Sequence, residues 1–250
     1  MNLGAPIAVG NTAEIYLCDN KIIKVFKDFL PPTESLYEAN KQKYVYSCGL
    51  PVPKILNVTE IAGKQAIIME YVEGKTIGDL LLKNMERTEY FINISVEIQQ
   101  NIHAHVADSL EPMSEQLIRK IQASSFLDNK HKSLLTKKLN GIKYEERLCH
   151  GDYHLFNLIQ AIHDVVIIDW VDSSAGDIRA DVCHTYLLYS QFSEKLAEMY
   201  LQIYCKKSGL LKDEIMQWAP IIAGAKLSEN MPSENVERFL EIVHSDCLHL

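Results

Sequence analysis

The stretch LCHGDYHLFN, residues 148–157, is followed a few positions later by VVIIDW, residues 165–170. The first stretch holds Asp152 and Asn157 beside a glycine, which indicates a loop rather than a helix face. The second is an apolar run, typical of a short strand, that ends at Asp169. Oxygen ligands from Asn157 and Asp169, converging at the mouth of a short hairpin, suit a hard cation such as Mg²⁺. Asp152 is then free to receive or orient a hydroxyl group.

Magnesium, a hydroxyl group and positioning residues together indicate phosphoryl transfer, which depends mostly on alignment and charge neutralisation. Such chemistry also requires groups that bind phosphates. Gly10, in GNTAEIY, stands before the first expected strand, where backbone without a side chain can approach a phosphate. Lys24 lies inside the apolar strand IIKVF, and Glu38 on the following helix offers a carboxylate to stabilise its charge. Alone, Gly10 reads as a turn and Lys24 as an edge-strand lysine; their order and spacing favour the functional interpretation.

A zinc site is the alternative interpretation of this stretch. His150 and His154 flank Asp152, but no further ligand pair at a familiar spacing supports zinc. The cysteines form no C-x-x-C pair, so they are expected to be reduced and mostly structural. The six are Cys18, Cys48, Cys149, Cys183, Cys205 and Cys247.

Composition narrows the class of protein. The chain has 250 residues, of which 47% are hydrophobic and 23% charged, which is typical of a globular protein with a substantial core. Its formal net charge of −8 argues against nucleic acid as a partner. No apolar run approaches the ~18 residues of a membrane span, and no signal peptide is recognisable. We therefore expect no membrane partner and a cytoplasmic location.

The first seventy residues predict the order strand, strand, helix, strand, strand. Asp19 and Asn20 tolerate positive φ and indicate a tight hairpin turn between two apolar runs. The helix is expected over residues 34–47, before a glycine and two prolines that stop it. A second hairpin is expected with its turn at Gly63 and Lys64.

The rest of the chain is predicted to be mainly helical, because apolar residues recur every three to four positions. The exception is a pair of short strands about a turn at His163 and Asp164. We interpret the chain as an N-terminal nucleotide-binding lobe (1–70), a hinge (71–74) and a catalytic and substrate-binding lobe (75–250). Helices are expected over two segments after Gly74 and near 114–125, 131–140, 180–193, 195–207, 211–227 and 233–247.

These motifs resemble those of the aminoglycoside phosphotransferase and choline kinase family, which has a protein-kinase-like fold. The match covers about residues 5–190. Its most specific part is H-G-D-x-H-x-x-N followed by I-D-W, present as His150, Gly151, Asp152, His154, Asn157, Ile168, Asp169 and Trp170. The segment GDIRADVC resembles another family motif, with Asp177 and Asp181 at its acidic positions, and NIHAH resembles a short L-H motif. The fold class implied is α+β with two lobes, a small antiparallel sheet with one helix and a larger, mainly helical part.

The resemblance also implies roles for individual residues. Asp152 is the catalytic aspartate, and Asn157 and Asp169 are the Mg²⁺ ligands. Lys24 reaches the nucleotide phosphates and is held by Glu38, while Asp181 is expected to support the structure of the loop. The nucleotide, ATP or in its place GTP, is expected to contact Gly10, Lys24, Glu38, Met69, Glu70 and Val72.

The acceptor is expected to be a hydroxyl group of a small molecule. Only eleven residues separate Asp169 from Asp181, which leaves little room for the activation segment of a protein kinase. A nucleotide-binding pseudokinase is a second alternative, which the joint presence of Lys24, Asp152, Asn157 and Asp169 disfavours. Residues 194–250 hold nine acids and six bases. Together with the aminoglycoside and choline acceptors of the family, this excess suggests a cationic acceptor.

Overall fold

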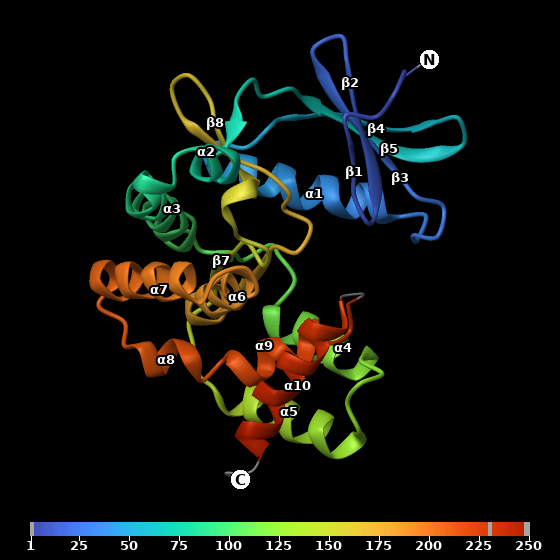
Figure 1. The fold of residues 1–250 in the computed structure, drawn as a ribbon. Helices are drawn as coiled ribbons and strands as arrows, with labels where there is room; N and C mark the ends of the chain where they lie inside the picture. The colour runs from blue at the N-terminus through green and yellow to red at the C-terminus, as the bar shows by residue number, and fades with distance from the viewer. Residues whose placement is uncertain (1–2, 230–231, 248–250) are drawn as a thin grey trace. The chain divides into compact units, whose positions relative to one another are not determined.

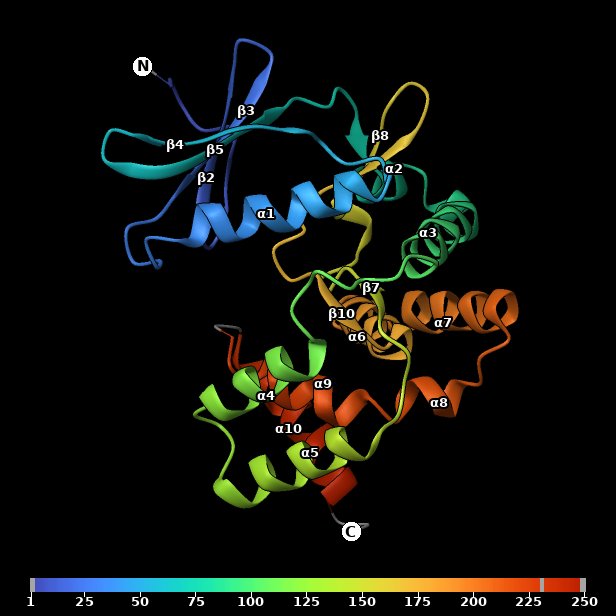
Figure 2. The same cartoon turned by 180° about the vertical axis from the view of Figure 1, so that it is seen from behind.

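The computed structural model describes residues 3–229 and 232–247, and their side chains through residue 245. The chain packs into two compact units (Figures 1 and 2). The first unit holds residues up to Asn84 together with Leu155–Asp172. The second unit holds Met85–His154 and the residues from Ser173 onward.

The first unit contains a five-stranded antiparallel sheet with the strand order β1-β2-β3-β5-β4. Helix α1 runs along one face of this sheet (Figure 1). The two layers meet in a small apolar core that contains Phe26, Ala39 and Ile67. The elements are β1 (Ala8–Val9), β2 (Ala13–Cys18), β3 (Lys21–Phe26), α1 (Glu34–Ser47), β4 (Ile55–Ile61) and β5 (Lys64–Glu70).

Two hairpins of this sheet, β2–β3 and β4–β5, close through two residues with positive φ. In the β2–β3 turn, Asp19 has φ 48° and Asn20 has φ 56°. In the β4–β5 turn, Ala62 has φ 53° and Gly63 has φ 80°. Such two-residue turns match the right-handed twist of the strands they join. The first turn lies where the sequence predicts it, and the second lies one residue earlier, because Lys64 already pairs with Ile61 in the ladder.

The first unit also contains a small three-stranded sheet in the order β6-β8-β9, next to helix α2. Here Gly78 of α2 lies against the ring of Phe156, since a Cβ at position 78 would come within 2.6 Å of it. A side chain at this position would push the helix away from the loop before β8. The elements are β6 (Lys75–Thr76), α2 (Ile77–Lys83), the 3₁₀ turn η2 (Leu155–Asn157), β8 (Leu158–Gln160) and β9 (Val165–Ile167).

The second unit is mainly helical, with a two-stranded antiparallel sheet of β7 and β10. Helices α3, α6 and α7 pack together, and α9 contacts α4, α5, α6 and α10 (Figure 2). The core contains the fully buried rings of Tyr153, Tyr200 and Trp218. The elements are η1 (Met85–Arg87), α3 (Thr88–His103), α4 (Met113–Ala123), α5 (Asn129–Gly141), β7 (Arg147–Cys149), β10 (Ser174–Gly176), α6 (Ile178–Ser190), α7 (Glu194–Ser208), α8 (Lys212–Met216), α9 (Ala219–Lys226) and α10 (Ser233–Cys247).

One predicted helix is wrong. The segment 211–227 forms two helices, α8 and α9, instead of one. Pro220 lies in the first turn of α9, where its missing N–H costs nothing. In an unbroken helix the same proline would remove a hydrogen bond and clash with the preceding turn.

The predicted fold class, α+β with an N-terminal antiparallel sheet and a helical remainder, is confirmed. The bounds of the compact units differ from those of the predicted lobes (1–70, 71–74 and 75–250), because residues 71–84 and 155–172 belong to the same unit as the N-terminal sheet. The lobes were defined by nucleotide and acceptor binding, so they stay a prediction. Among the described residues, no helix combines the length and the apolar character needed to cross a bilayer.

Candidate active site

Lys24 occupies the middle of β3, and its ammonium group is held by two carboxylates of the first unit. Its Nζ lies 2.6 Å from Oε1 of Glu38 on α1 and 3.5 Å from Oδ1 of Asp169. Burial alone would lower the pKa of Lys24, but the charges of Glu38 and Asp169 outweigh it and raise the pKa. The structure therefore brings together the lysine and glutamate that the sequence pairs, with a cationic lysine at neutral pH.

Asp169 follows β9 in a strained conformation. Its φ of 64° lies in the left-handed region, which is uncommon for residues other than glycine and is found often at functional sites, although aspartate tolerates it better than most. Its Oδ1 atom is buried and accepts no hydrogen bond from any described residue; the lysine contact at 3.5 Å is an ion pair. A buried carboxylate oxygen without a hydrogen-bond donor is expected where a cation binds.

Asn157 lies at the same end of the β8–β9 hairpin as Asp169. In the ladder Leu158 pairs with Ile167, and the N–H of Ile168 donates to the carbonyl oxygen of Asn157 at 3.0 Å. The side chain of Asn157 is buried. The hairpin thus carries both predicted metal ligands at its open end.

Gly10 precedes β2 in a turn that does not require a glycine. Its N–H donates to the carbonyl oxygen of Ala13 at 2.9 Å, and its own carbonyl accepts from Lys27 Nζ at 2.8 Å. A Cβ at this position would lie no closer than 3.5 Å to its neighbours, which is ordinary contact. The fold itself would therefore tolerate a side chain here.

The residues predicted to contact the base lie at the end of β5 and just after it. Met69 packs against the apolar core of the first unit. The backbone N–H of Glu70 donates to the carbonyl oxygen of Lys54 at 3.0 Å, and the Glu70 carboxylate accepts from the N–H of Lys54 at 3.1 Å. Glu70 and Val72 line a pocket of about 460 Å³ in the first unit, which leaves this segment open to a small molecule.

In the second unit, Asp152 follows a glycine with a left-handed conformation. Gly151 has φ 80°, and its N–H donates to Oδ1 of Asp181 at 2.7 Å. The N–H of Asp152 donates to Nδ1 of His150 at 3.3 Å, so His150 supports the loop. His154 Nε2 lies 3.5 Å from Oδ2 of Asp152. The sequence predicts that both residues belong to one loop.

The charge of Asp152 is favoured by its surroundings. Burial alone would raise the pKa of Asp152, but the hydrogen bond and charge of His154, with His184 and Lys226, hold it well below its usual range. An ionised carboxylate can orient a hydroxyl group. Because proton-transfer efficiency falls as the pKa of a base moves far from the working pH, this carboxylate is better suited to orientation than to strong base catalysis.

Asp181, on α6, supports the loop that carries Asp152, as the sequence interpretation expected. It is buried and accepts from Gly151, from His103 Nε2 at 2.9 Å and from Gln99 Nε2 at 3.1 Å. Burial alone would raise the pKa of Asp181, but these hydrogen bonds and the charge of His103 keep it well below its usual range. Its carboxylate therefore stays ionised. Buried His103, Cys149 and Asp181 lie together here, and the hydrogen bonds of Asp181 explain its burial without a zinc ion.

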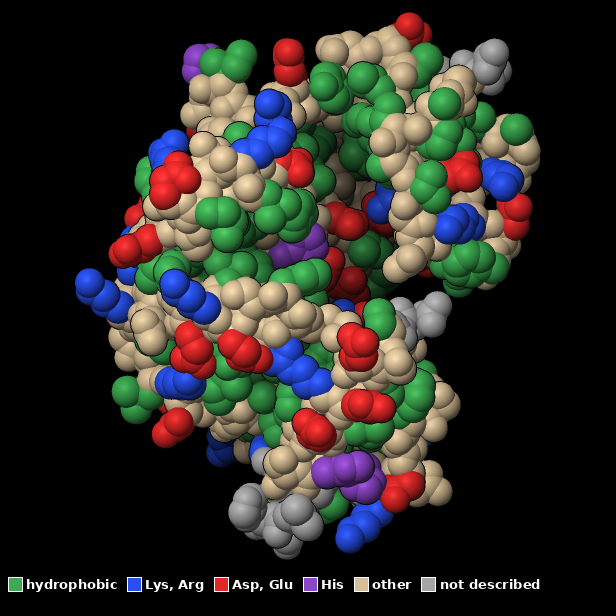
Figure 3. Space-filling model, in the orientation of Figure 1, with side chains coloured by type: hydrophobic (Ala, Val, Ile, Leu, Met, Phe, Trp, Pro, Cys, Tyr) green, Lys and Arg blue, Asp and Glu red, His purple; other side chains and the backbone are tan. Residues whose placement is uncertain are grey.

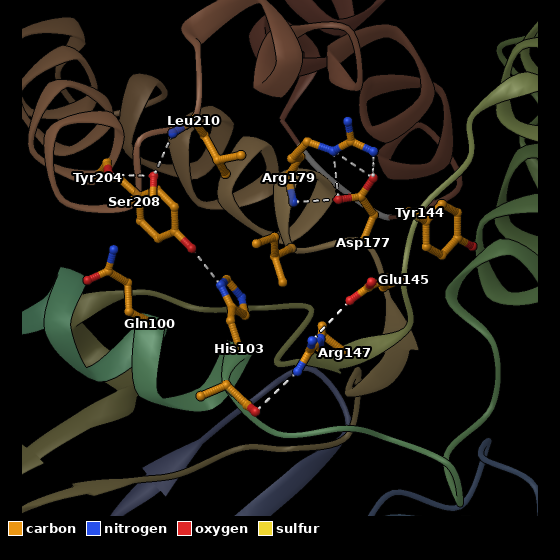
Figure 4. A pocket seen from close by; sticks show the side chains of 12 residues that line it. Gln100, His103, Tyr144, Glu145, Arg147, Asp177, Arg179, Tyr204, Ser208 and Leu210 are labelled. Atoms are coloured by element: carbon orange, nitrogen blue, oxygen red, sulfur yellow. Dashed lines mark hydrogen bonds and ion pairs between the residues drawn. The ribbon is translucent and has the colours of Figure 1, made fainter.

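His103, whose Nε2 atom faces Asp181, also lines a pocket of about 520 Å³ (Figure 4). Its wall includes Tyr204, whose hydroxyl forms a hydrogen bond with His103 Nδ1 at 2.7 Å. The charged side chains in its lining are already paired, Arg179 with Asp177 and Arg147 with Glu145. The pocket is thus connected to the catalytic loop through Tyr204, His103 and Asp181.

The sequence interpretation missed His184 and Lys226, whose charges act on Asp152, and Lys120, whose charge acts on His184. They come from α4, α6 and α9, and no motif or spacing connects them. Only the fold brings them together, so the sequence carried no signal for them.

A family model described as the phosphotransferase enzyme family matches residues 5–215. The chain belongs to this family. Curated relatives include acyl-CoA dehydrogenase family member 11 of Homo sapiens, which is 25% identical over 213 residues, covering 69% of this chain and 27% of the relative. Family member 10 of Mus musculus is 26% identical over 249 residues, covering 80% of this chain and 23% of the relative. The chain therefore spans about a quarter of the length of these curated relatives.

Solved structures of small-molecule kinases share the fold. Aminoglycoside phosphotransferase APH(4)-Ia, in a ternary complex with AMP-PNP and hygromycin B, superimposes with a TM-score of 0.70 at 14% identity, covering 96% of this chain and 92% of that one. Amicoumacin kinase, in complex with AMP-PNP, Ca²⁺ and its antibiotic, superimposes with a TM-score of 0.63 at 15% identity, covering 96% and 86%. The predicted resemblance to aminoglycoside phosphotransferases is confirmed at the level of family and fold.

Proposed function

We propose that this phosphotransferase family member is a small-molecule kinase, which moves the γ-phosphoryl group of ATP to a hydroxyl group. The observation that carries the proposal is the environment of Asp169, with a buried carboxylate oxygen that no described hydrogen-bond donor reaches and a lysine 3.5 Å away. A carboxylate in this state suits a cation bound to phosphates better than a purely structural role.

In the first unit, Lys24 binds the α- and β-phosphates, and Glu38 keeps its ammonium group in place at 2.6 Å. Gly10 allows the backbone to approach the phosphates, which explains a glycine that the turn itself does not require. Met69 and the backbone from Glu70 to Val72 hold the base. AMP-PNP and ADP are bound by proteins of the same fold, which supports ATP as the nucleotide, with GTP as the alternative.

Asn157 and Asp169 would hold Mg²⁺, because their oxygen atoms are the ligands this ion prefers and both lie at one end of a hairpin. When bound, the ion neutralises the negative charge that develops on the transferred phosphoryl group. Since Asp169 also contacts Lys24, the position of the metal and that of the phosphates are set by the same carboxylate.

In the second unit, Asp152 orients the acceptor. The hydroxyl oxygen forms a bond to the γ-phosphorus as the bond from that phosphorus to the bridging oxygen breaks, and ADP leaves. The hydroxyl proton passes to Asp152 or through it to water. Because the pKa of Asp152 is held well below its usual range, its carboxylate is ionised and can accept a hydrogen bond from the hydroxyl group.

Two alternatives follow from the same residues. A nucleotide-binding pseudokinase would keep the fold without turnover; the ionised Asp152 and the polar network behind it argue for activity. A protein kinase needs an activation segment, whereas here β10 begins at Ser174, five residues after Asp169. One measurement therefore distinguishes the proposed small-molecule kinase from the pseudokinase and from the protein kinase: the transfer of phosphate to a small molecule.

The test uses [γ-³²P]ATP with Mg²⁺ and a panel of hydroxylated small molecules, followed by separation of the products. Transfer that depends on both Mg²⁺ and Asp152 supports the proposal. Tight nucleotide binding with neither transfer nor hydrolysis would indicate the pseudokinase.

A further inference from the structure

Behind Asp152, the second unit gathers cationic and imidazole side chains from three helices. Lys120 lies on α4, His184 on α6 and Lys226 on α9. The two lysines share Glu229, whose carboxylate lies 2.5 Å from Lys226 and 3.3 Å from Lys120. Lys226 is close enough to Asp152 for its charge to lower the pKa of that carboxyl.

His184 is the unusual member of this group. Its ring is only 8% exposed, and its Nε2 atom has no hydrogen-bond partner within residues 3–229 and 232–245. A buried polar atom in this state is costly, because it has lost water and gained nothing in return. Buried imidazoles normally have a partner, so the missing one is expected to come from a bound molecule.

The charges that face His184 are those of Asp152, Lys226, Glu229 and Lys120. Asp152 is assigned to the acceptor hydroxyl. Of the other three, Lys226 faces both His184 and Asp152, so a cation lies beside the carboxylate that would orient the hydroxyl. A positive charge beside an unpartnered imidazole nitrogen attracts an anionic group and repels an amine.

We propose that the acceptor carries an anionic group, a carboxylate or a phosphate, on a carbon close to its reacting hydroxyl. His184 Nε2 and Lys226 Nζ bind this group, while Asp152 orients the hydroxyl. This inference rests on the proposed function and names the substrate class of the same site.

Of the acidic residues that suggested a cationic acceptor, Glu229 lies beside His184 and is paired with Lys226 and Lys120, whereas others pair with different cations or are exposed. Glu194 pairs with Arg238 at 2.5 Å, and Glu198 pairs with Lys212 at 2.9 Å. On the face of the second unit shown in Figure 3, acidic and basic side chains are intermixed. The excess of acids in residues 194–250 therefore lies largely on solvated helix surfaces, where it does not select a cation.

The first test measures binding without turnover, using four probes with one three-carbon diol skeleton. The probes are glycerate, glycerol 3-phosphate, glycerol and 3-amino-1,2-propanediol. The ring signal of His184, assigned by its loss in His184→Gln, is followed by NMR as each probe is added. We expect glycerate or glycerol 3-phosphate to shift this signal and to raise the pKa of His184, and the first two probes distinguish a carboxylate from a phosphate site.

An equal shift with glycerol or with the amine would overturn the inference, as would the absence of a shift with both anions at the solubility limit. The shift does not depend on catalysis, so it remains informative if none of the probes is phosphorylated.

The second test is kinetic. Lys226→Gln is expected to raise the KM of an anionic acceptor at least about tenfold with little change in kcat, because the lysine binds the acceptor equally in the ground and transition states. Lys226→Arg should restore most of the affinity, which a misfolded variant would not. Lys212→Gln, which removes an exposed lysine paired with Glu198, is the matched control and should behave like the wild type.

The two proposals fail in different ways. If the amine or glycerol is phosphorylated and the anions are ignored, the kinase function stands and the anionic acceptor is excluded. If the anions shift His184 but ATP is consumed in no Asp152-dependent reaction, the anion site stands and the proposed function is wrong.

Discussion

The carboxylate of Asp181 accepts a hydrogen bond of 2.7 Å from the backbone N–H of Gly151. This bond fixes the residue before Asp152 in its left-handed conformation, with φ 80°. Because Asp181 is buried on α6 and is itself held by His103 of α3, two helices determine the backbone that carries the proposed catalytic aspartate.

We expect Asp181→Ala to reduce the free energy of unfolding by about 3 kcal/mol, because it leaves buried hydrogen-bond donors and His103 without their anionic partner. Urea denaturation measures this loss. In the folded fraction, kcat should fall while the nucleotide Kd stays unchanged, since Asp181 belongs to the second unit. Asp164→Asn, at the exposed tip of the β8–β9 hairpin, is the control. A folded Asp181→Ala enzyme with full kcat would show that the bond to Gly151 does not position Asp152.

Asp152→Asn should lower kcat by ~10² to 10⁴-fold, the usual contribution of an orienting or general-base group. The nucleotide Kd should stay within a factor of about two, because no nucleotide contact is lost. Steady-state kinetics and calorimetric titration with AMP-PNP measure the two quantities. Full activity of the variant would exclude Asp152 from the role proposed here.

Lys24→Ala should weaken nucleotide binding and leave Glu38 buried without a cation. The loss of one charged phosphate contact is expected to raise the Kd of ATP about tenfold or more. As a control, Lys64→Ala removes an exposed lysine paired with Asp28 in the same unit, and should leave the Kd of ATP unchanged. An unchanged Kd in Lys24→Ala would place the phosphates away from β3.

His184 makes the stability of the protein depend on pH. Burial, with the charge of Lys226, lowers the pKa of His184 to about 4, whereas in the unfolded chain it is about 6.5. Between these values the unfolded state binds a proton that the folded state does not, so the free energy of unfolding falls as the pH is lowered from 6.5 to 4. The difference is roughly 3 kcal/mol at most.

Urea denaturation at several pH values tests this dependence. Compared with the wild type, His184→Gln should show a smaller decrease in stability over that window. His163→Gln, in the exposed turn between β8 and β9, should follow the wild type. Parallel curves for the wild type and His184→Gln would mean that His184 titrates normally in the folded protein.

Local signals predicted the first unit well. The turn residues Asp19 and Asn20 define one hairpin. Helix α1 begins and ends at the predicted residues, and its end is marked by Gly49, which follows with φ 83°. The pairing of Lys24 with Glu38 was also predicted, since both belong to one compact unit and to a recognisable motif.

Other features depend on the tertiary structure and left no local signal. The strands β1 and β6 have two residues each, which is too short to show an alternating pattern. Lys120, His184 and Lys226 are separated by long stretches of sequence, and their neighbourhood arises only from the packing of α4, α6 and α9. An acid count over residues 194–250 could not reveal which acids are paired, so it does not decide the charge of the acceptor, which stays a prediction.

The boundary between the two compact units falls between His154 and Leu155, inside the H-G-D-x-H-x-x-N motif. Residues 85–154 are thus an insertion in the unit that holds Lys24 and Asp169. A fragment that stops at Asn84 would retain the five-stranded sheet but would lack Asn157 and Asp169, so it would have neither proposed metal ligand. Conversely, an exchange of residues 85–146 and 173–250 between relatives is expected to change the acceptor preference and to leave the proposed nucleotide-binding residues of the first unit unchanged.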